Sequence, residues 1–268
     1  MADLFKQKFG ISIGLVVKDR MGVFMENGIN YMEFRISKPH DKEFSLSLIE
    51  EVIKEREKYG FEIRTCHLPF SEGFDLSVIE EADRIRAVEN QKEMVNWLSV
   101  LRPQMLVLHP SRGEVSYEMR ALRKEALIKS LKEFAPYCKK MGMRVALENL
   151  TPGNLLMSSG DLLEVIEAVG EDNIGICFDV NHLFAESHRD FIKKAGKHII
   201  TMHISDNDGI KERHFEPGDG VLDWHEIFSL MDEIDYDSTM ICELGSVLSG
   251  FPDTVPVLKK KLQDVTSR

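Results

Sequence analysis

The chain has 268 residues, of which 43% are hydrophobic, so it is long and apolar enough to bury a sizeable core. Its formal net charge of -11 disfavours a protein that holds nucleic acid or an anionic membrane through a broad basic surface. No apolar run approaches the ~18 residues of a membrane span, and no linker-like stretch divides the chain. We therefore expect one domain over residues 1–268, with neither membrane nor nucleic acid as a partner.

Short apolar runs alternate with amphipathic segments along the chain. The predicted strands cover residues 11–17, 31–36, 61–67, 105–109, 143–148, 174–179, 198–203 and 238–243. The predicted helices cover residues 19–27, 45–59, 77–101, 117–141, 188–196, 224–234 and 253–265, and one more begins with Ser159 as its N-cap. In the helix over 77–101, the predicted inner face consists of Ile79, Ala82, Ile85, Ala87, Val88, Met94, Val95 and Leu98. Strands that each precede a helix predict an α/β fold, a single (β/α)8 TIM barrel.

Six of the predicted strands end in a side chain that can bind a metal. These residues are His67, His109, Glu148, Asp179, His203 and Glu243. Because the carboxyl ends of barrel strands meet at one rim, we expect the six side chains to gather in an active site. Isolated charges inside an apolar barrel would be costly, and a divalent metal offsets that cost.

The last four of these residues supply three carboxylates and one imidazole: Glu148, Asp179, His203 and Glu243. This oxygen-rich set suits Mn²⁺, Mg²⁺, Co²⁺ or Zn²⁺, and no organic cofactor is expected. Such a metal can chelate a hydroxy-ketone through both oxygens and stabilise an enediolate, while a nearby carboxylate removes the adjacent carbon-bound proton. Two carboxylates on opposite faces of the substrate would allow the proton to be removed from one face and a proton to be returned to the other.

A second set of candidates follows Asp179 and lies in the long polar loop over residues 205–220. His182 comes three residues after Asp179, and Glu212 and His214 lie at i and i+2, on one side of an extended segment. The alternative is a polar loop with local turn hydrogen bonds. The additional metal or substrate ligands predicted here are His67, His109, His182, Glu212 and His214.

Two arginines are weaker candidates for substrate binding. Arg35 lies near the end of the second predicted strand, and Arg112 follows the fourth. Their positions near the expected active-site rim favour substrate contacts, although surface roles explain them equally well.

Four cysteines occur without a Cys-x-x-Cys motif, and three of them, Cys66, Cys177 and Cys242, lie in predicted strands. This pattern is typical of buried thiols in a reducing cytosol. The first ten residues, MADLFKQKFG, lack the apolar core of a signal peptide. We therefore expect a cytoplasmic protein.

The ordered motifs between residues 67 and 245 resemble the xylose isomerase-like TIM barrel superfamily. They are HLPF, LVLHP, ALENL, GICFDVNH, HISDNDG, RHFEPGDGVLDW and ICELG. They are similar to its sugar phosphate isomerase/epimerase branch, which is related to the endonuclease IV-type nucleases (AP endonuclease family 2). The resemblance implies substrate contact by His182 and an acid/base role for Glu148 and Glu243. It also implies that one catalytic metal is held by Glu148, Asp179, His203 and Glu243.

The nuclease relatives use three zinc ions, and all nine matching positions hold a candidate ligand here. The resemblance to them implies one site of His67, His109 and Glu148. It implies that Glu148 bridges to a second site, of Asp179, His203 and Glu243. It implies a third site of His182, Glu212 and His214. Glu212 stands where that family has Asp, and its longer side chain matters because ligand distances are fixed to within about 0.2 Å.

The leading functional hypothesis is a divalent-metal-dependent isomerase or epimerase of a small sugar, keto-polyol or related hydroxy-carbonyl compound. One alternative is a zinc phosphoesterase acting on abasic DNA, although the loop after the third strand carries only acidic charge. A dehydratase acting on the same metal enolate and a non-catalytic sugar-binding barrel are further alternatives. The expected partners are a small sugar-like substrate and further copies of the chain in a homo-oligomer.

Overall fold

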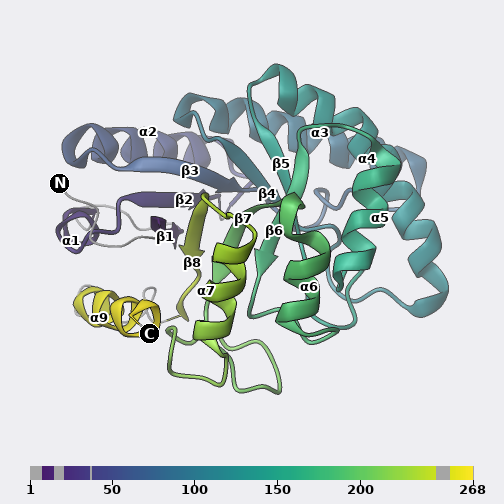
Figure 1. Ribbon diagram of the computed structural model, residues 1–268. Coiled ribbons are helices and arrows are strands. Elements are labelled where there is room, and N and C mark those ends of the chain that lie inside the picture. The colour runs from purple at the N-terminus through teal and green to yellow at the C-terminus, as the bar shows by residue number, and fades with distance from the viewer. Residues whose placement is uncertain (1–7, 15–20, 37, 246–253, 268) are drawn as a thin grey trace.

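The computed structural model describes residues 8–14, 21–36, 38–245 and 254–267. Parts of the predictions lie outside them, namely those for residues 1–7, 15–17, 19–20 and 253. Among the described residues, eight parallel strands pair in chain order and the last pairs with the first, so the sheet closes into a barrel (Figure 1). The fold is the predicted single (β/α)8 TIM barrel.

Strands and helices alternate along the chain. The strands are β1 (Lys8–Ile13), β2 (Tyr31–Arg35), β3 (Glu62–His67), β4 (Met105–Leu108), β5 (Arg144–Glu148), β6 (Ile174–Asp179), β7 (Ile199–Ile204) and β8 (Thr239–Cys242). The helices are α1 (Met21–Glu26), α2 (Lys42–Tyr59), α3 (Glu81–Leu98), α4 (Arg120–Lys140), α5 (Ser159–Val169), α6 (His188–Ala195), α7 (Trp224–Glu233) and α9 (Thr254–Thr266). The helices lie around the outside of the strands (Figure 1). None of the helices that the structure describes has the length and apolarity to cross a membrane.

Most predicted boundaries agree with the structure to within a few residues. The stop of α2 is confirmed, because Gly60 adopts the left-handed conformation and its N–H donates to the carbonyl of Arg56. The strand β1 begins at Lys8 rather than at residue 11, because residues 8–11 pair with β8. The helix α3 begins at Glu81 rather than at residue 77.

The predicted N-cap of α5 is wrong by one residue. Ser158 is the cap, and its side chain accepts a hydrogen bond from the N–H of Asp161. Ser159 instead begins the helix, and both its N–H and its hydroxyl donate to the carboxylate of Glu186. Ser158 is the cap because it has the extended backbone that a cap requires, whereas the Ser159 hydroxyl donates to Glu186.

The predicted inner face of α3 is also partly wrong. Three of its predicted residues are exposed: Ile79, Ala82 and Ile85. Arg84 and Gln91 are buried on this helix instead. Arg84 pairs with one glutamate of α3 and one of α4, and Gln91 donates to two carbonyls of the loop after β3. Polar side chains can occupy such positions when their hydrogen bonds are satisfied.

Side chains along each strand alternate between the barrel interior and the helix layer. In β5, Val145 and Leu147 join the main core, whereas Ala146 belongs to a separate small cluster. That cluster consists of Met105, Val107, Ala146, Cys177 and Ile200. Glu148 lies two residues beyond Ala146, so it shares the inward face at the carboxyl end of the strand.

Strand register then aligns the functional residues at one rim. Glu148 is paired with Cys177, and Asp179 is paired with His203. His203 is in turn paired with Ile241, two residues before Glu243. Because all strands run the same way, the ends of β5 to β8 present these side chains together.

Candidate metal centre

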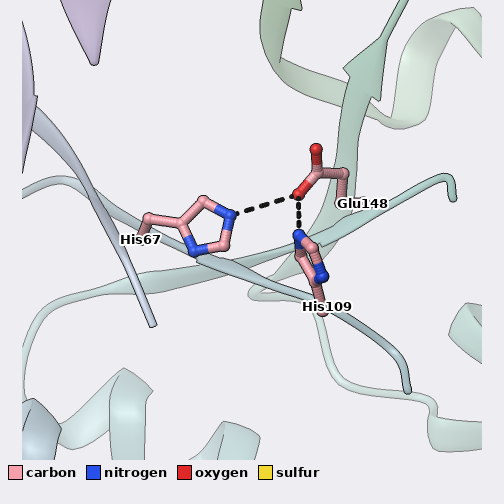
Figure 2. A group of neighbouring side chains, drawn as sticks. All are labelled: His67, His109 and Glu148. Atoms are coloured by element: carbon pink, nitrogen blue, oxygen red, sulfur yellow. Dashed lines mark ion pairs between the residues drawn. The ribbon is translucent and has the colours of Figure 1, made fainter. Parts of the chain in front are cut away.

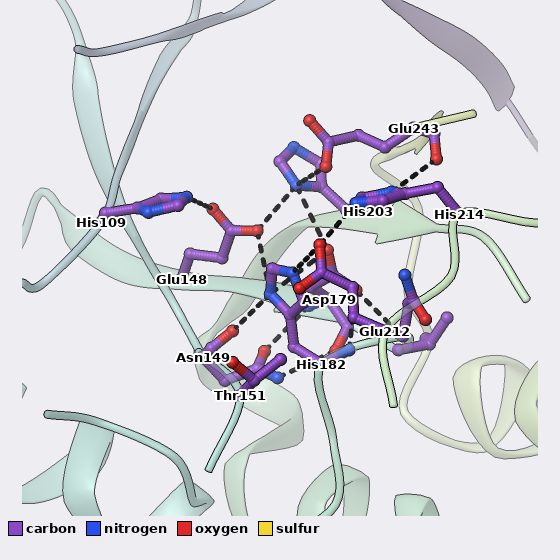
Figure 3. Close-up of polar contacts among 12 residues, drawn as sticks. His109, Glu148, Asn149, Thr151, Asp179, His182, His203, Glu212, His214 and Glu243 are labelled. Carbon is purple, nitrogen blue, oxygen red and sulfur yellow. Dashed lines mark hydrogen bonds and ion pairs between the residues drawn. The ribbon is translucent and has the colours of Figure 1, made fainter. Parts of the chain in front are cut away.

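Four of the predicted ligands meet at the carboxyl-end rim of the barrel. Glu148 and Asp179 end β5 and β6, His203 lies in β7 and Glu243 follows β8. Each offers one ligand atom, and these four atoms all lie within 4.8 Å of one another. Figure 3 shows the side chains converging from the neighbouring strands. We call Glu148, Asp179, His203 and Glu243 the central group.

The imidazole of His203 lies among the three carboxylates of the central group. Its Nδ1 atom is 3.0 Å from Glu148 Oε1, 3.7 Å from Glu243 Oε2 and 3.8 Å from Asp179 Oδ2. Glu243 is 9% exposed, whereas the other three side chains are fully buried. Glu243 is therefore the member of the group that is most accessible to a substrate.

The backbone around Asp179 leaves one of its carboxylate oxygens available. Oδ1 accepts hydrogen bonds from the N–H groups of Asn181 and His182, at 2.7 and 3.2 Å. Oδ2 is buried and accepts no hydrogen bond from the described residues. The side chain of Asn149 holds the Asp179 backbone from both sides, accepting from its N–H and donating to its carbonyl, each at 2.8 Å. Asp179 is thus fixed with a buried oxygen that accepts no hydrogen bond within the described chain and lies 3.5 and 3.8 Å from the Nδ1 atoms of His182 and His203.

The two inner carboxylates have pKa values shifted in opposite directions, because neighbouring imidazoles outweigh the effect of burial at Glu148 but not at Asp179. Burial raises the pKa of Asp179 to about 7, and the neighbouring charge of Glu148 adds to this effect. Burial also opposes ionisation of Glu148, but the imidazoles of His203 and His109 outweigh it and hold its pKa well below the usual range. A divalent cation would relieve the repulsion between these carboxylates.

The donor set of the central group fits a divalent metal. The group offers three carboxylates and one imidazole, and Oδ2 of Asp179 accepts no hydrogen bond from the part of the chain that the structure describes. This set matches the ligand preferences of Mn²⁺, Mg²⁺, Co²⁺ and Zn²⁺. Four protein ligands also leave coordination positions for substrate oxygens when the metal is six-coordinate.

A second set of ligands shares Glu148 with the central group. His67 Nε2 and His109 Nε2 lie 3.3 and 3.0 Å from Glu148 Oε2 (Figure 2). We call His67, His109 and Glu148 the side group. The ring of Phe70 stacks on His109, with centroids 4.0 Å apart and an interplanar angle of 11°. Glu148 therefore bridges the two groups, with Oε2 toward the side group and Oε1 toward His203.

The third set lies on loops rather than on strands. We call His182, Glu212 and His214 the loop group. Glu212 Oε1 lies 3.4 Å from His182 Nε2 and is hydrogen-bonded to His214 Nε2. The hydrogen bond with Glu212 raises the pKa of His214 to about 9. Burial lowers the pKa of His182, but Asp179 and Glu212 outweigh it and raise that pKa to about 10.

A buried carboxylate, Asp206, organises the loop that carries Glu212 and His214. It accepts hydrogen bonds at 2.7 to 3.1 Å from three backbone N–H groups and one indole, those of Asn207, Gly218, Leu222 and Trp224. Its backbone also pairs with that of Phe215. At Gly220, an added Cβ would lie 2.2 Å from the carbonyl oxygen of Asn207, so only glycine fits there. Sequence reasoning did not single out Asp206 for this role.

The structure places the two candidate arginines differently. Arg35 Nη1 is 3.9 Å from Glu243 Oε1, and Arg35 lines a cavity of about 130 Å³ with Ser12, Glu243 and His214. Arg112 is exposed, and its backbone N–H donates to Asp75. Among the described residues, no contact joins the Arg112 side chain to the three ligand groups.

Sequence reasoning also missed Glu33 in β2. This side chain is fully buried and lies 3.0 Å from His203 Nε2, on the side of the ring opposite the central group. Burial opposes its ionisation, but His203 outweighs that effect and lowers the pKa of Glu33 to about 2. A lone carboxylate in the middle of the apolar run YMEFRI was the signal that could have identified it.

Solved structures with the same fold include sugar-converting and zinc-binding proteins. One is a D-tagatose 3-epimerase-like protein, with a TM-score of 0.79 and 22% identity over 97% of this chain and 99% of that one. Another is the IOLI protein with a bound zinc atom, with a TM-score of 0.80 and 18% identity over 97% and 98% of the two chains. At these identities the likeness shows the fold alone.

Curated relatives include both uncharacterised and named proteins. An uncharacterised protein of Methanocaldococcus jannaschii, MJ1311, is 26% identical over 97% of this chain and 91% of its own length. Fructoselysine 3-epimerase of Escherichia coli O157:H7 is 26% identical over 47% of each chain. The 2-oxo-tetronate isomerase of Haemophilus influenzae is 32% identical over 47% of this chain and 51% of its own. The matches to the two named enzymes thus span about half of each chain.

Residues 24–261 match the family described as xylose isomerase-like TIM barrel, and the chain belongs to this family. The match covers most of the chain and confirms the resemblance seen in the motifs. The named relatives reported above are an epimerase and an isomerase.

Proposed function

We propose that this member of the xylose isomerase-like TIM barrel family is a divalent-metal-dependent isomerase or epimerase of a small sugar, keto-polyol or related hydroxy-carbonyl compound. The observation that carries the proposal is the central group. In it, two glutamates and an aspartate whose Oδ2 accepts no hydrogen bond from any described residue converge on one imidazole nitrogen. A barrel that only bound sugars would not need this buried concentration of carboxylates.

Each member of the central group has a defined task in the proposed reaction. Glu148, Asp179, His203 and Glu243 would hold the metal, which supplies polarisation of the substrate carbonyl when it is bound. Glu148 and Glu243 would serve as acid and base, one removing the carbon-bound proton and the other returning a proton. They come from different strand ends, β5 and β8, yet approach the same nitrogen of His203. The two carboxylates would thus reach the substrate from different directions.

The surrounding residues support binding and orientation. The side-group histidines lie 3.3 and 3.0 Å from Glu148 Oε2, and Oε1 is directed toward His203 of the central group. The cavity beside Glu243 is lined by Arg35, which we propose as a substrate contact. The four cysteines are free, buried thiols, which supports a cytosolic location.

A second candidate function is a zinc phosphoesterase, because the nine predicted ligands do gather into three adjoining groups. Loss of a proton and then of a β-hydroxyl, as in a dehydratase, would use the same central group. These alternatives differ from an isomerase in the number of metals and in the product, so the same experiment separates them.

The test combines metal content with a reaction readout that works for a substrate not yet identified. Purified protein is dialysed against trace metals, and its metal content is measured by elemental analysis. It is then incubated in D₂O with a panel of ketoses, keto-polyols and hydroxy-keto acids, and deuterium uptake beside the carbonyl is followed by NMR. We expect about one tightly bound metal and deuterium uptake into at least one compound.

The matched control pair is Glu243→Gln and Glu125→Gln, the latter on the exposed face of α4. The first should abolish deuterium uptake and the second should not change it. Three zinc ions per chain with nicking of abasic DNA, and no uptake into any compound, would replace the proposal with the phosphoesterase. Formation of a dehydrated product would replace it with the dehydratase.

A further inference from the structure

Glu33 is a carboxylate enclosed in the barrel wall. In β2, its neighbours Met32 and Phe34 join the apolar core under the helices, so Glu33 points to the opposite face, the barrel interior. Its side chain is fully buried. An ionised carboxylate in such a place is strongly destabilising unless its oxygens receive hydrogen bonds.

The carboxylate oxygens of Glu33 accept hydrogen bonds from side chains on three other strands. Oε1 accepts from the hydroxyl of Ser12 on β1 at 2.9 Å, and Oε2 accepts from the hydroxyl of Thr65 on β3 at 2.8 Å. Oε2 also lies 3.0 Å from Nε2 of His203 on β7. A carboxylate is an acceptor, so the ring nitrogen that faces it must carry the hydrogen.

This contact decides what the other nitrogen of His203 can do. With the hydrogen on Nε2, the neutral ring has its lone pair on Nδ1. Nδ1 is the atom that lies 3.0 to 3.8 Å from the three carboxylates of the central group. In the metal-free protein Nδ1 also lies within hydrogen-bond distance of a carboxylate, Glu148 Oε1 at 3.0 Å. A bound cation would displace a proton from Nδ1 but not from Nε2, because Glu33 lies outside the central group, and the Nδ1 lone pair would then complete the ligand set.

We propose that Glu33 is a positioning residue that fixes His203 as the Nε2–H tautomer and so directs its Nδ1 lone pair to the metal. The inference rests on the proposed metal site in the central group. Glu33 would not touch the metal or the substrate, and it would act only through His203. A carboxylate that accepts from a metal-bound imidazole typically strengthens metal binding about 10- to 100-fold.

The alternative role for Glu33 is structural, because the same carboxylate ties β1, β2 and β3 together. The Thr65→Val variant provides the matched control, since it removes one hydrogen bond to the same oxygen without altering the contact with His203. Glu33→Gln keeps the size of the side chain but replaces the carboxylate with an amide, whose N–H₂ group can donate to Nε2 and reverse the tautomer.

The first experiment is titration of the metal-free proteins with Zn²⁺ against a competing chelator. We expect Glu33→Gln to weaken Zn²⁺ binding about 10- to 100-fold, while Thr65→Val changes it less than about threefold even if both variants lose similar thermal stability. Equal Zn²⁺ affinity in wild type and a folded Glu33→Gln variant would overturn the inference but leave the metal site intact. Absence of Zn²⁺ binding in the wild type would instead remove the proposed metal site, and the inference with it.

The second experiment needs only the wild-type chain, so it remains decisive if Glu33→Gln does not fold. The ¹⁵N chemical shifts of the His203 ring in the Zn²⁺-loaded protein distinguish a protonated from a metal-bound nitrogen. We expect Nε2 to be protonated and Nδ1 to be metal-bound. Coordination through Nε2 would exclude the proposed role of Glu33.

Discussion

The central group and the loop group contain similar ligands but are built in different ways. Three of the four members of the central group lie in the strands β5, β6 and β7, and the fourth follows β8 directly, whereas the loop group lies entirely outside the strands. Central-group side chains are at most 10% exposed. The side chains of Glu212 and His214 are about one third exposed, at 35% and 33%.

The difference lies in what fixes the ligands. Register between neighbouring strands aligns Asp179 with His203, so main-chain hydrogen bonds position the central group. In the loop group, Glu212 and His214 lie in the segment that the side chain of Asp206 gathers by accepting hydrogen bonds from its N–H groups. We expect the central group, whose ligands are fixed by strand register, to carry the reaction and to lose activity when one of its ligands is replaced. We expect the loop anchored by Asp206 to unfold locally more easily, and its ligands to contribute less to kcat.

The largest expected effect comes from the bridging carboxylate of the central group. Glu148→Gln should lower kcat by about 1,000-fold or more, equivalent to about 4 kcal/mol of barrier, because it removes a proposed acid/base and metal ligand. The same substitution in the loop group, Glu212→Gln, should lower kcat less than about tenfold. Steady-state kinetics with the substrate found by deuterium uptake provides the measurement, and circular dichroism checks folding. Similar losses in the two variants would erase the distinction between the groups.

The next largest effect concerns the anchor of the loop. Asp206→Ala should lower the free energy of unfolding by about 2–3 kcal/mol, because it leaves buried N–H groups without an acceptor. Asp206→Asn retains one acceptor oxygen and should lose less. Urea denaturation gives the stabilities, and hydrogen exchange shows whether residues 205–222 open while the strands stay protected. Uniform loss of protection over the whole barrel would contradict the role of Asp206 as a local anchor.

A smaller effect is expected when the loop group loses a ligand. His214→Ala should leave the metal content of the central group at about one ion and change kcat/KM for a sugar-like substrate less than about tenfold. Elemental analysis and kinetics on the same preparation provide the check. Loss of most isomerase activity would show that the loop belongs to the substrate site, and loss of nicking activity alone would favour the phosphoesterase.

The smallest effect is a dependence of loop stability on pH in the metal-free protein. His214 has a pKa of about 9 in the folded chain against an ordinary 6.5, so folding favours its protonated form. The stabilisation is therefore fully present below pH 6.5 and is lost as the pH rises through about 9. Hydrogen exchange of residues 205–222, corrected for intrinsic rates, should show faster opening over this range. In the Glu212→Gln variant, opening of residues 205–222 should depend less on pH. If β5 to β7 showed the same increase in opening with pH as the loop, the effect could not be assigned to His214.

The barrel and the central group could be predicted from sequence because both are encoded locally. An apolar run that ends in a carboxylate or imidazole can be recognised within five or six residues, as in RVALE and IGICFD. Parallel strands then bring these ends to one rim without any further information. The same reasoning failed on α3, where Arg84 and Gln91 replaced predicted apolar residues, because their partners lie on other elements.

The sequence by itself thus determined the fold, the rim at which the ligands gather and the chemical kinds of those ligands. Only the tertiary structure decided how they are held. Glu33 and His203 are 170 residues apart and meet across the barrel, and Asn149 fixes Asp179 from the neighbouring strand end. Asp206 likewise collects N–H groups from up to 18 residues further along the chain. The physical reason is that hydrogen-bond geometry between distant residues depends on the closed barrel, which no local pattern records.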